Sequence, residues 1–279
     1  MLVPLKIRGK VFDFSRTYVM GIINVTEDSF YPSSRVDISN ISKVAKQMEE
    51  EGADILDVGA ESTRPGALPI NAKEEAEKIV QAVKEIRKVT DLPISIDTYR
   101  ASTAEAGIKA GADMINDISG LKFDPHMAKT IANLDVPVVV MHIKGTPRDM
   151  QKDPHYDDVI KEVHSELEHS IDIATKAGIA KEKIIIDPGI GFGKRLKDNL
   201  NLIAHLDLFT DLNLPILIGI SRKSMINMIM PMDVSERLEP TIALNSAAVM
   251  KGANIVRVHD VRPHVKAMKM IDALKEVQK

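Results

Sequence analysis

The side chains in this sequence that are best suited to chemistry are polar residues that end short apolar runs. Asp97, Asn116 and Asp187 each stand at the end of such a run. Carboxylate and amide oxygens accept hydrogen bonds and the amide also donates, so this trio suits a flat heterocycle with amino and ring N–H donors along one edge. Lys223 adds a donor for an exocyclic carbonyl on the same ring. The alternative for Asp97 is that it caps a helix beginning at Ala101.

The run that carries Asp187 continues into a glycine-rich loop, Asp187-Pro-Gly-Ile-Gly-Phe-Gly-Lys194. Three consecutive isoleucines before the loop predict a strand that is buried on both faces. Glycine tolerates positive φ and has no side chain, so the backbone N–H groups of such a loop can approach a ligand closely. The alternative is a tight turn without a ligand.

A second group of candidate residues is cationic. Arg257 and His259 alternate on the last apolar run, so both are predicted to point to one face. Arg64 lies in the polar segment Glu61-Ser-Thr-Arg-Pro-Gly66. Because arginine binds phosphate oxygens through a bidentate fork, these residues predict an anion site. The alternative is that they form salt bridges with Asp260 or Glu61.

The segment Ser221-Arg-Lys-Ser224 follows the seventh apolar run and leaves two interpretations open for Lys223. Lys223 is either a Schiff-base nucleophile, as in barrel aldolases, or a charged donor that orients a substrate. Ser224 falls where the next helix is expected to begin, a position that suits a carboxylate. The histidines do not have the spacing of a metal site, since His164 and His169 are five residues apart rather than four.

These residues need a scaffold that brings the ends of distant apolar runs together. Eight runs alternate with helical patterns, which predicts a parallel sheet covered by helices. Eight units in roughly 250 residues match a (β/α)8 barrel, whose active site lies at the C-terminal ends of the strands. A doubly wound open sheet would normally carry a glycine-rich phosphate turn after its first strand, and Asn24-Val-Thr-Glu-Asp-Ser-Phe30 is not one. We therefore predict an α/β fold, a single TIM-barrel domain over residues 1–279, with a short N-terminal β-hairpin at Lys6–Phe14.

The predicted strands are Tyr18–Thr26, Asp54–Ala60, Ile94–Thr98, Met114–Ser119, Pro137–His142, Ile184–Asp187, Ile216–Ser221 and Asn254–Asp260. The predicted helices are Ser39–Glu51, Ala72–Val89, Ala101–Ala110, one from near Pro125, Tyr156–Ala177, Ser235–Met250 and Val265–Val277.

The composition agrees with a soluble globular protein and argues against several other classes. Of the 279 residues, 44% are hydrophobic and 28% are charged, the ordinary range for a globular chain. A net charge of −3 and the lack of tryptophan give no basis for a nucleic-acid surface. The lack of cysteine excludes disulfides, thiolate zinc sites and a cysteine nucleophile. No apolar region of the kind found in signal sequences follows Met1, and no apolar run is long enough to span a membrane, so we expect a cytoplasmic protein with no membrane partner. Met225, Met228 and Met230 are expected to fill gaps in the packing.

Eight motifs, taken together, resemble dihydropteroate synthase in sequence and in order, and they extend from about Tyr18 to Pro263. That family has a (β/α)8 barrel, in agreement with the periodicity. The motifs are Met20-Gly-Ile-Ile-Asn-Val-Thr-Glu-Asp-Ser-Phe30, Glu61-Ser-Thr-Arg-Pro-Gly66, Ser95-Ile-Asp-Thr98, Asn116-Asp-Ile-Ser-Gly120, Met141-His142, Asp187-Pro-Gly-Ile-Gly-Phe-Gly-Lys194, Ser221-Arg-Lys-Ser224 and Arg257-Val-His-Asp260.

The resemblance implies a transferase of folate biosynthesis. Such an enzyme joins 6-hydroxymethyl-7,8-dihydropterin diphosphate to 4-aminobenzoate and releases 7,8-dihydropteroate and diphosphate. It further implies Mg²⁺ as cofactor, with Asn24 as a ligand, and a homodimer, as is usual in the family. By matching position, the pterin is held by Asp97, Asn116, Met141, Asp187 and Lys223, the diphosphate by Asn24, Thr63, Arg64, Arg257 and His259, and the aminobenzoate by Phe30, Pro65, Phe192, Lys223 and Ser224. The residues with implied catalytic roles are Asp97, Asp187, Lys223 and Arg257.

One loop departs from the family pattern, and three other functions remain open. After Asp28-Ser-Phe30 the family commonly continues with Ser-Asp-Gly-Gly, whereas this chain has Tyr31-Pro-Ser-Ser34. The other functions are a methyltransferase that passes a methyl group from a reduced pterin to a corrinoid partner, a non-catalytic pterin-binding barrel, and an aldolase that uses Lys223. The cationic motifs argue against the methyltransferase, since a methyl donor has no diphosphate to hold.

Overall fold

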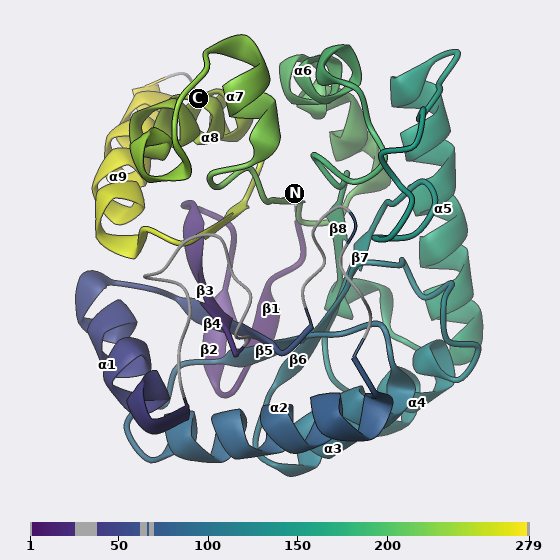
Figure 1. Ribbon diagram of the computed structural model, residues 1–279, viewed down its shortest axis with the longest axis vertical. Helices are drawn as coiled ribbons and strands as arrows, with labels where there is room; N and C mark the ends of the chain where they lie inside the picture. The colour runs from purple at the N-terminus through teal and green to yellow at the C-terminus, as the bar shows by residue number, and fades with distance from the viewer. Residues whose placement is uncertain (1, 26–37, 62–65, 67–69, 278–279) are drawn as a thin grey trace.

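The computed structural model describes residues 2–25, 38–61, 66 and 70–277, and its main feature is a parallel barrel ringed by helices (Figure 1). Eight strands lie in the order β8-β7-β6-β5-β4-β3-β10-β9. The barrel closes where Ile186 of β8 forms a parallel bridge with Ile216, just before β9. The predicted (β/α)8 fold is confirmed. The strands are β3 (Tyr18–Asn24), β4 (Ile55–Gly59), β5 (Ile94–Asp97), β6 (Met114–Asp117), β7 (Val138–Met141), β8 (Ile184–Asp187), β9 (Leu217–Ile218) and β10 (Ile255–Val258).

Helices alternate with these strands and surround them on all sides in Figure 1. None of the helices in the described ranges is both long and apolar enough to cross a bilayer. The α-helices are α1 (Ile41–Glu51), α2 (Ala72–Arg87), α3 (Ala101–Lys109), α4 (Met127–Leu134), α5 (Val159–Ala177), α6 (Leu196–Ala204), α7 (Ser224–Ile229), α8 (Leu238–Met250) and α9 (Val261–Val277). Short 3₁₀ turns span Ile38–Asn40, Lys181–Lys183, Leu206–Leu212 and Val234–Glu236.

The sequence misplaces some boundaries. The last helix begins at Val261, so the predicted start at Val265 is wrong; Pro263 fits because the first turn of a helix has no intrahelical partner for its N–H groups. Strand β9 is shorter than predicted, since the chain turns where Lys223 N donates to Ile220 O at 3.1 Å. Helix α6 has no counterpart among the predicted helices.

The prediction that three methionines after the seventh strand fill packing gaps is wrong for two of them. Met225 is buried, but Met228 and Met230 are 61% and 54% exposed. Helix α7 has only six residues, so its second half and the segment after it turn away from the core.

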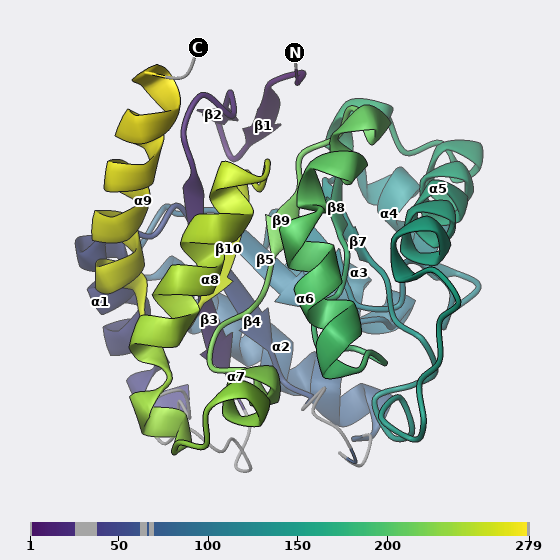
Figure 2. The same cartoon turned by 90° about the horizontal axis from the view of Figure 1, so that it is seen from above.

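The N-terminal hairpin closes one end of the barrel, opposite the end where α7 lies (Figure 2). Strands β1 (Leu5–Ile7) and β2 (Lys10–Phe12) pair in antiparallel register around Arg8 and Gly9, which both have positive φ, as a tight two-residue hairpin turn requires. Its apolar side chains pack against inward-facing residues of the barrel strands. This cluster contains Leu5, Ile7, Phe12, Tyr18, Met20, Ile55, Met114, Val139, Ile185, Leu217 and Ile255.

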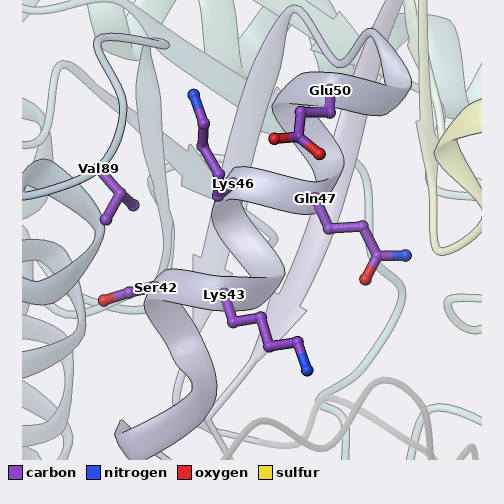
Figure 3. Close-up of a pocket in the computed structure, with 6 residues that line it drawn as sticks. All are labelled: Ser42, Lys43, Lys46, Gln47, Glu50 and Val89. Atoms are coloured by element: carbon purple, nitrogen blue, oxygen red, sulfur yellow. The ribbon is translucent and has the colours of Figure 1, made fainter.

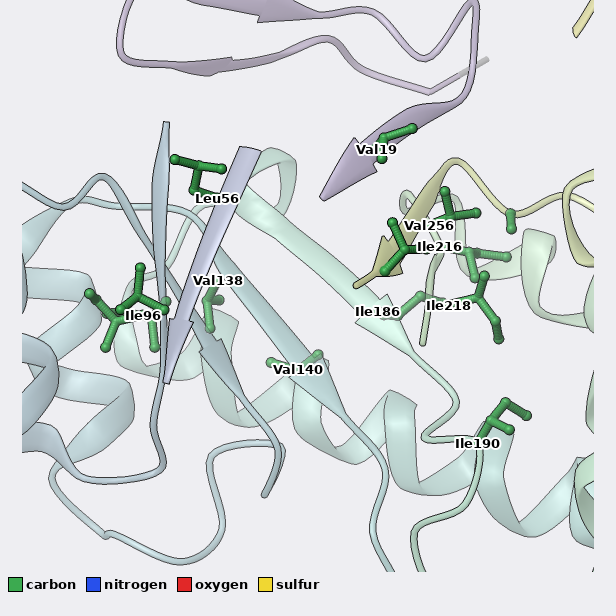
Figure 4. Packing of buried hydrophobic residues seen from close by; sticks show 14 of the residues in the cluster. Val19, Leu56, Ile96, Val138, Val140, Ile186, Ile190, Ile216, Ile218 and Val256 are labelled. Atoms are coloured by element: carbon green, nitrogen blue, oxygen red, sulfur yellow. The ribbon is translucent and has the colours of Figure 1, made fainter. Parts of the chain in front are cut away.

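The alternate strand residues face outward and form a second, larger apolar cluster with the helices. Figure 4 shows Val19, Leu56, Ile96, Val138 and Val256 among the side chains of this cluster. Because both faces of each strand are covered, the strands carry near-continuous apolar runs, as a parallel sheet requires.

Candidate active site

At the end of the barrel opposite the hairpin, the inward-facing residues become polar. Side chains alternate along a strand, so the residue two positions beyond an inner apolar residue also points inward, one level higher. On four strands this next inner residue is charged or carries an amide. The pairs, with the apolar residue first, are Ile55 and Asp57, Met114 and Asn116, Ile185 and Asp187, and Ile255 and Arg257. The strand ends predicted from the sequence therefore meet in one layer.

Arg257 joins two carboxylates of this polar layer. Its Nε donates to Asp57 Oδ2 at 2.6 Å and its Nη2 donates to Asp97 Oδ2 at 2.6 Å. Asn116 Nδ2 donates to the same Asp57 oxygen at 3.1 Å. Asp57 was predicted to end the second strand at this rim but was given no ligand role, and it is fully buried. Its only signal in the sequence is an acidic residue inside an apolar strand, two positions before Gly59.

Asp97 combines burial with an unused acceptor. Burial raises the pKa of Asp97 from 3.8 to about 7; the Arg257 guanidinium acts in the opposite direction, while the Asp57 carboxylate adds to the rise. Within the described residues, Oδ1 of Asp97 and Oδ1 of Asp57 are buried without a hydrogen-bond partner. A buried acceptor without a partner is unfavourable, and a donor on a bound ligand would remove this cost. These oxygens therefore suit a ligand with N–H groups.

Lys223 lies against the glycine-rich loop that follows β8. Its Nζ donates to Ile190 O and lies 4.5 Å from the centroid of the Phe192 ring. Gly191 has φ +84, and a Cβ there would be 3.1 Å from Lys223 Cδ, so the lysine stem lies close to the loop backbone. Burial lowers the pKa of Lys223 to about 8, while the Asp187 carboxylate acts to raise it.

Asp187 is oriented by its own loop. Gly189 N donates to Asp187 Oδ1 at 2.7 Å, which places the carboxylate at the start of the glycine-rich turn. Burial raises the pKa of Asp187, and the Lys223 ammonium opposes this rise. Asp187 also pairs in register with Met141 of the neighbouring strand. Met141 belongs to a small apolar cluster at this end of the barrel, against which Phe192 packs.

Two carboxylates near the polar layer form salt bridges with arginines other than Arg257. Arg222, not Arg257, pairs with Asp260, through two contacts of 2.8 and 2.9 Å. Likewise Glu61 pairs with Arg100, with Nη2 and Oε2 2.7 Å apart. Asp260 and Glu61, the carboxylates that the sequence offered for such salt bridges, thus pair with other arginines among the described residues, and the predicted role of Arg64 lies outside them.

His259 and Ser224 flank the seventh and eighth strands at the same end. His259 Nδ1 lies 3.0 Å from Ser221 Oγ, and this contact joins the ends of the two strands. Helix α7 begins at Ser224, as predicted, with Lys223 at its N-cap position. Ser224 therefore follows directly the lysine that faces the polar layer.

Asn24 ends β3 with a partly exposed side chain, whereas four predicted site residues, Phe30, Thr63, Arg64 and Pro65, lie outside the described residues. An amide oxygen is a hard ligand that suits Mg²⁺, which commonly keeps several waters and binds substrate phosphates as well. In the part of the chain that the structure describes, no group of three histidine or acidic residues could hold a metal ion by itself. Asn24 would therefore suit a magnesium ion that a phosphorylated ligand also binds.

A surface hollow on the outer helix layer is a different feature from this site. It lies along α1 and is lined by Ser42, Lys43, Lys46, Gln47, Glu50 and Val89 (Figure 3). The lysines, the glutamate and the glutamine are ordinary residues of the solvent-facing side of an amphipathic helix. None of these residues comes from a strand end, so the hollow has no part in the polar layer.

The fold and this layer of acids, an amide, a lysine and an arginine define a barrel that suits a polar heterocycle. Residues 20–259 match the family described as "Pterin binding enzyme". A dihydropteroate synthase of Clostridium beijerinckii is 44% identical over 273 residues, which cover 97% of this chain and 99% of the relative.

Solved structures agree with this assignment. A dihydropteroate synthase of Xanthomonas albilineans with 4-aminobenzoic acid has a TM-score of 0.91 at 39% identity, with 99% of each chain covered. The enzyme of the same organism in complex with 7,8-dihydropteroate has a TM-score of 0.89 at 36% identity, covering 98% of this chain and 99% of that one. The chain belongs to the dihydropteroate synthases of the pterin binding enzyme family.

Proposed function

We propose that the polar layer at the mouth of the barrel joins 6-hydroxymethyl-7,8-dihydropterin diphosphate to 4-aminobenzoate and releases diphosphate and 7,8-dihydropteroate. The observation that carries this proposal is the convergence of Asp97, Asn116, Asp187 and Lys223 with Arg257 at one end of a pterin-binding barrel. Two related structures, whose ligands are 4-aminobenzoic acid and 7,8-dihydropteroate, support the same substrate and product.

The pterin ring is assigned to the acids and the amide. A pterin presents amino and ring N–H donors along one edge, and Asp97 Oδ1 is a buried acceptor without a partner among the described residues. Asp187 supplies a second carboxylate, and Asn116 both accepts and donates. Lys223 donates to the exocyclic carbonyl, and Met141 provides an apolar surface for the ring.

The diphosphate is assigned to the cationic side of the layer. Arg257 and His259 come from the same strand end, and a guanidinium suits two phosphate oxygens. Positive charge stabilises the negative charge that grows on the departing diphosphate. Mg²⁺, with Asn24 as a ligand, would supply further positive charge there when bound. Thr63 and Arg64 are proposed to contribute from the loop after β4.

The arylamine then attacks the methylene carbon that the diphosphate leaves. That carbon carries cationic character conjugated to the pterin, and the carboxylates of Asp97 and Asp187 stabilise it. The attacking nitrogen is neutral, so no strong base is needed, and the proton that it loses after the C–N bond forms passes to water or to the released diphosphate. Phe192, Lys223 and Ser224 are proposed to frame the aminobenzoate, together with Phe30 and Pro65. Holding both substrates in the barrel lowers the barrier by proximity.

The test mixes purified protein, Mg²⁺, the pterin diphosphate and labelled 4-aminobenzoate. We expect labelled dihydropteroate to form and to depend on both substrates. Failure to form it by protein with an intact fold would reject the proposal. Binding of methyltetrahydrofolate without any dependence on Mg²⁺ would favour the methyltransferase instead, and trapping of a carbonyl substrate on Lys223 by borohydride would favour an aldolase.

We also propose that the protein is a homodimer that works in the cytoplasm. Helices α8 and α9 lie side by side in both Figure 1 and Figure 2. They expose Met250, Met270 and Leu274 at 38%, 66% and 56%. Exposed apolar side chains on neighbouring helices are typical of an interface between copies of a chain. Sedimentation of the wild type and of Met270→Glu would test this, and an unchanged dimer in the variant would exclude this face. The cytoplasmic location rests on the lack of cysteine and is tested by cell fractionation.

A further inference from the structure

Lys194, at the end of the glycine-rich loop, is a buried lysine that the proposed reaction does not use. Its side chain is only 3% exposed. Nζ lies 2.8 Å from His142 Nδ1, 2.8 Å from Gly189 O and 3.0 Å from Phe192 O. A longer contact of 3.5 Å to His142 O adds a fourth acceptor, so each N–H group of the Lys194 amine has an acceptor within reach. Burial lowers the pKa of Lys194, and the Asp187 and Asp198 carboxylates oppose this only from beyond salt-bridge distance among the described residues, so the neutral acceptors have to compensate for much of the burial of the amine.

His142 is suited to be an acceptor of this kind. It is 3% exposed, and burial lowers its pKa well below the usual value, with the Lys194 ammonium acting in the same direction. A neutral imidazole has one nitrogen that accepts a hydrogen bond. With Nδ1 facing Lys194, that nitrogen is the acceptor and Nε2 carries the proton.

The loop between Gly189 and Gly193 lies directly on the segment that follows β7. A Cβ on Gly189 would be 1.9 Å from His142 O, and one on Gly193 would be 2.2 Å from Lys144 O. Both glycines have positive φ. Backbone thus contacts backbone, and the Lys194 amino group bonds the loop carbonyls at positions 189 and 192, on either side of Ile190.

Ile190 is the residue whose carbonyl oxygen accepts from Lys223 Nζ, and Phe192 is the residue whose ring lies 4.5 Å from it. The carbonyls that accept from Lys194, at positions 189 and 192, therefore lie on the same short loop as the Ile190 carbonyl and the Phe192 ring that contact Lys223. We propose that Lys194 is a positioning residue for Lys223, and that it acts by holding the 189–193 loop so that Ile190 O and the Phe192 ring stay against the Lys223 amine. This inference rests on the proposed role of Lys223 in the synthase site.

The test replaces Lys194 by methionine, which keeps the length of the side chain and removes its N–H donors. Lys144→Met is the matched control: Lys144 lies on the neighbouring loop and bonds His155 O and Glu162, away from Lys223. Each variant is measured for its melting temperature, its turnover, and the pH dependence of acetylation of Lys223, which is followed by mass spectrometry. The acetylation profile reports the titration of Lys223 among Asp187, Asp97, Arg257 and Lys194, the charged groups that act on it.

In Lys194→Met we expect turnover to fall by at least about tenfold. We expect the Lys223 titration to move to lower pH by about one unit, because loss of the hydrogen bond from the Lys223 ammonium to Ile190 O outweighs loss of the Lys194 charge, which acts in the opposite direction. Lys144→Met is expected to match the wild type in both. A lower melting temperature with an unshifted Lys223 profile would show a merely structural role and overturn the proposal. An unchanged variant would overturn it as well.

A second pair of variants covers the case in which Lys194→Met fails to fold. His142→Asn keeps an acceptor oxygen near the place of Nδ1, whereas His142→Leu removes it. We expect the wild-type Lys223 profile in the asparagine variant and the shifted profile in the leucine variant, and identical profiles would contradict the proposal. Because acetylation does not depend on turnover, a wild-type protein that forms no dihydropteroate would refute the proposed function and leave this test intact.

Discussion

The two ends of the barrel interior are formed by the same strands but have opposite chemistry. At the hairpin end, Ile55, Met114, Ile185 and Ile255 pack against the side chains of β1 and β2. Two residues further along, the same strands present Asp57, Asn116, Asp187 and Arg257. The step between the two layers is one inward-facing position on each strand.

The residues that stabilise the fold and the residues suited to chemistry therefore lie at opposite ends of the barrel. Each apolar side chain at the hairpin end contributes about 1.5–3 kcal/mol by leaving water. The charges at the other end lose hydration, and pairs such as Arg257 with Asp57 offset only part of that loss. The barrel therefore derives stability from the closed end, and this allows the open end to hold carboxylates in an unfavourable state that a ligand relieves.

The largest expected effect of a single change is at Lys223. In Lys223→Ala we expect turnover to fall by about 10²–10³-fold, as when a donor to the reacting ligand is removed from a preorganised site. The circular dichroism spectrum and the melting temperature should remain close to the wild type, because Lys223 lies at the open end and its amine donates to a loop carbonyl rather than to a core residue. Turnover like that of the wild type would remove Lys223 from the site.

A pair of changes on β8 tests the comparison on one strand. Ile185→Ala, at the hairpin end, should lower the free energy of unfolding by about 2–5 kcal/mol, the usual cost of deleting a buried aliphatic side chain. Asp187→Asn, two positions on, should lower turnover strongly and leave stability nearly unchanged, because the amide oxygen can still accept from Gly189 N. Denaturant titration and steady-state kinetics separate the two. Equal losses of stability in both variants would contradict the division between the ends.

The apolar layers were predictable from the sequence because burial depends on local alternation. Runs such as Ile184–Asp187 are apolar on both faces, and that alone indicates a strand inside a helix-covered parallel sheet. The polar strand ends were predictable for a second reason: parallel strands bring their C-terminal ends together. Helix α7 is too short to show a period of its own, and only Ser224 indicated its start.

The partners of the site residues were not predictable from the sequence. Arg257 was predicted to bind an anion, and the alternative was a salt bridge with Asp260 or Glu61. Its salt bridges are instead with Asp57 and Asp97, from strands far away in the sequence. Ion pairing depends on which side chains share a level of the closed barrel, and that level is set by the register between strands. The buried contact between Lys194 and His142 has the same origin, because a lysine after glycines looks like an exposed loop residue.

Two glycines with similar backbone angles, one in the hairpin and one in the loop at the open end, allow the two ends to be compared by the same substitution. Gly9 in the hairpin has φ +75 and open space where a Cβ would stand, whereas Gly189 has φ +69 and its Cβ would be 1.9 Å from His142 O. Gly9→Ala should cost only the left-handed backbone strain, about 1–2 kcal/mol. Gly189→Ala should cost more and also lower turnover, because the loop that carries Ile190 and Phe192 has to move. Similar melting temperatures for the two variants would show that the close approach at Gly189 is relieved at little cost.

The last expected effect is a dependence of stability on pH that belongs to the open end. Burial raises the pKa of Asp97 to about 7 from 3.8, so between these values the folded barrel holds a proton that the unfolded chain has released. The contribution of Asp97 to the free energy of unfolding is therefore constant below about pH 3.8, decreases as the pH rises to about 7, and is constant again above it. Asp97→Asn removes this group, so its stability relative to the wild type should increase across that window. Ile185→Ala removes no titratable group and should keep the pH dependence of stability of the wild type. Urea titrations of the three proteins from pH 4 to 8 measure the difference. Parallel slopes for the wild type and Asp97→Asn would show that Asp97 is already ionised throughout the window, because its pair with Arg257 outweighs the effect of burial.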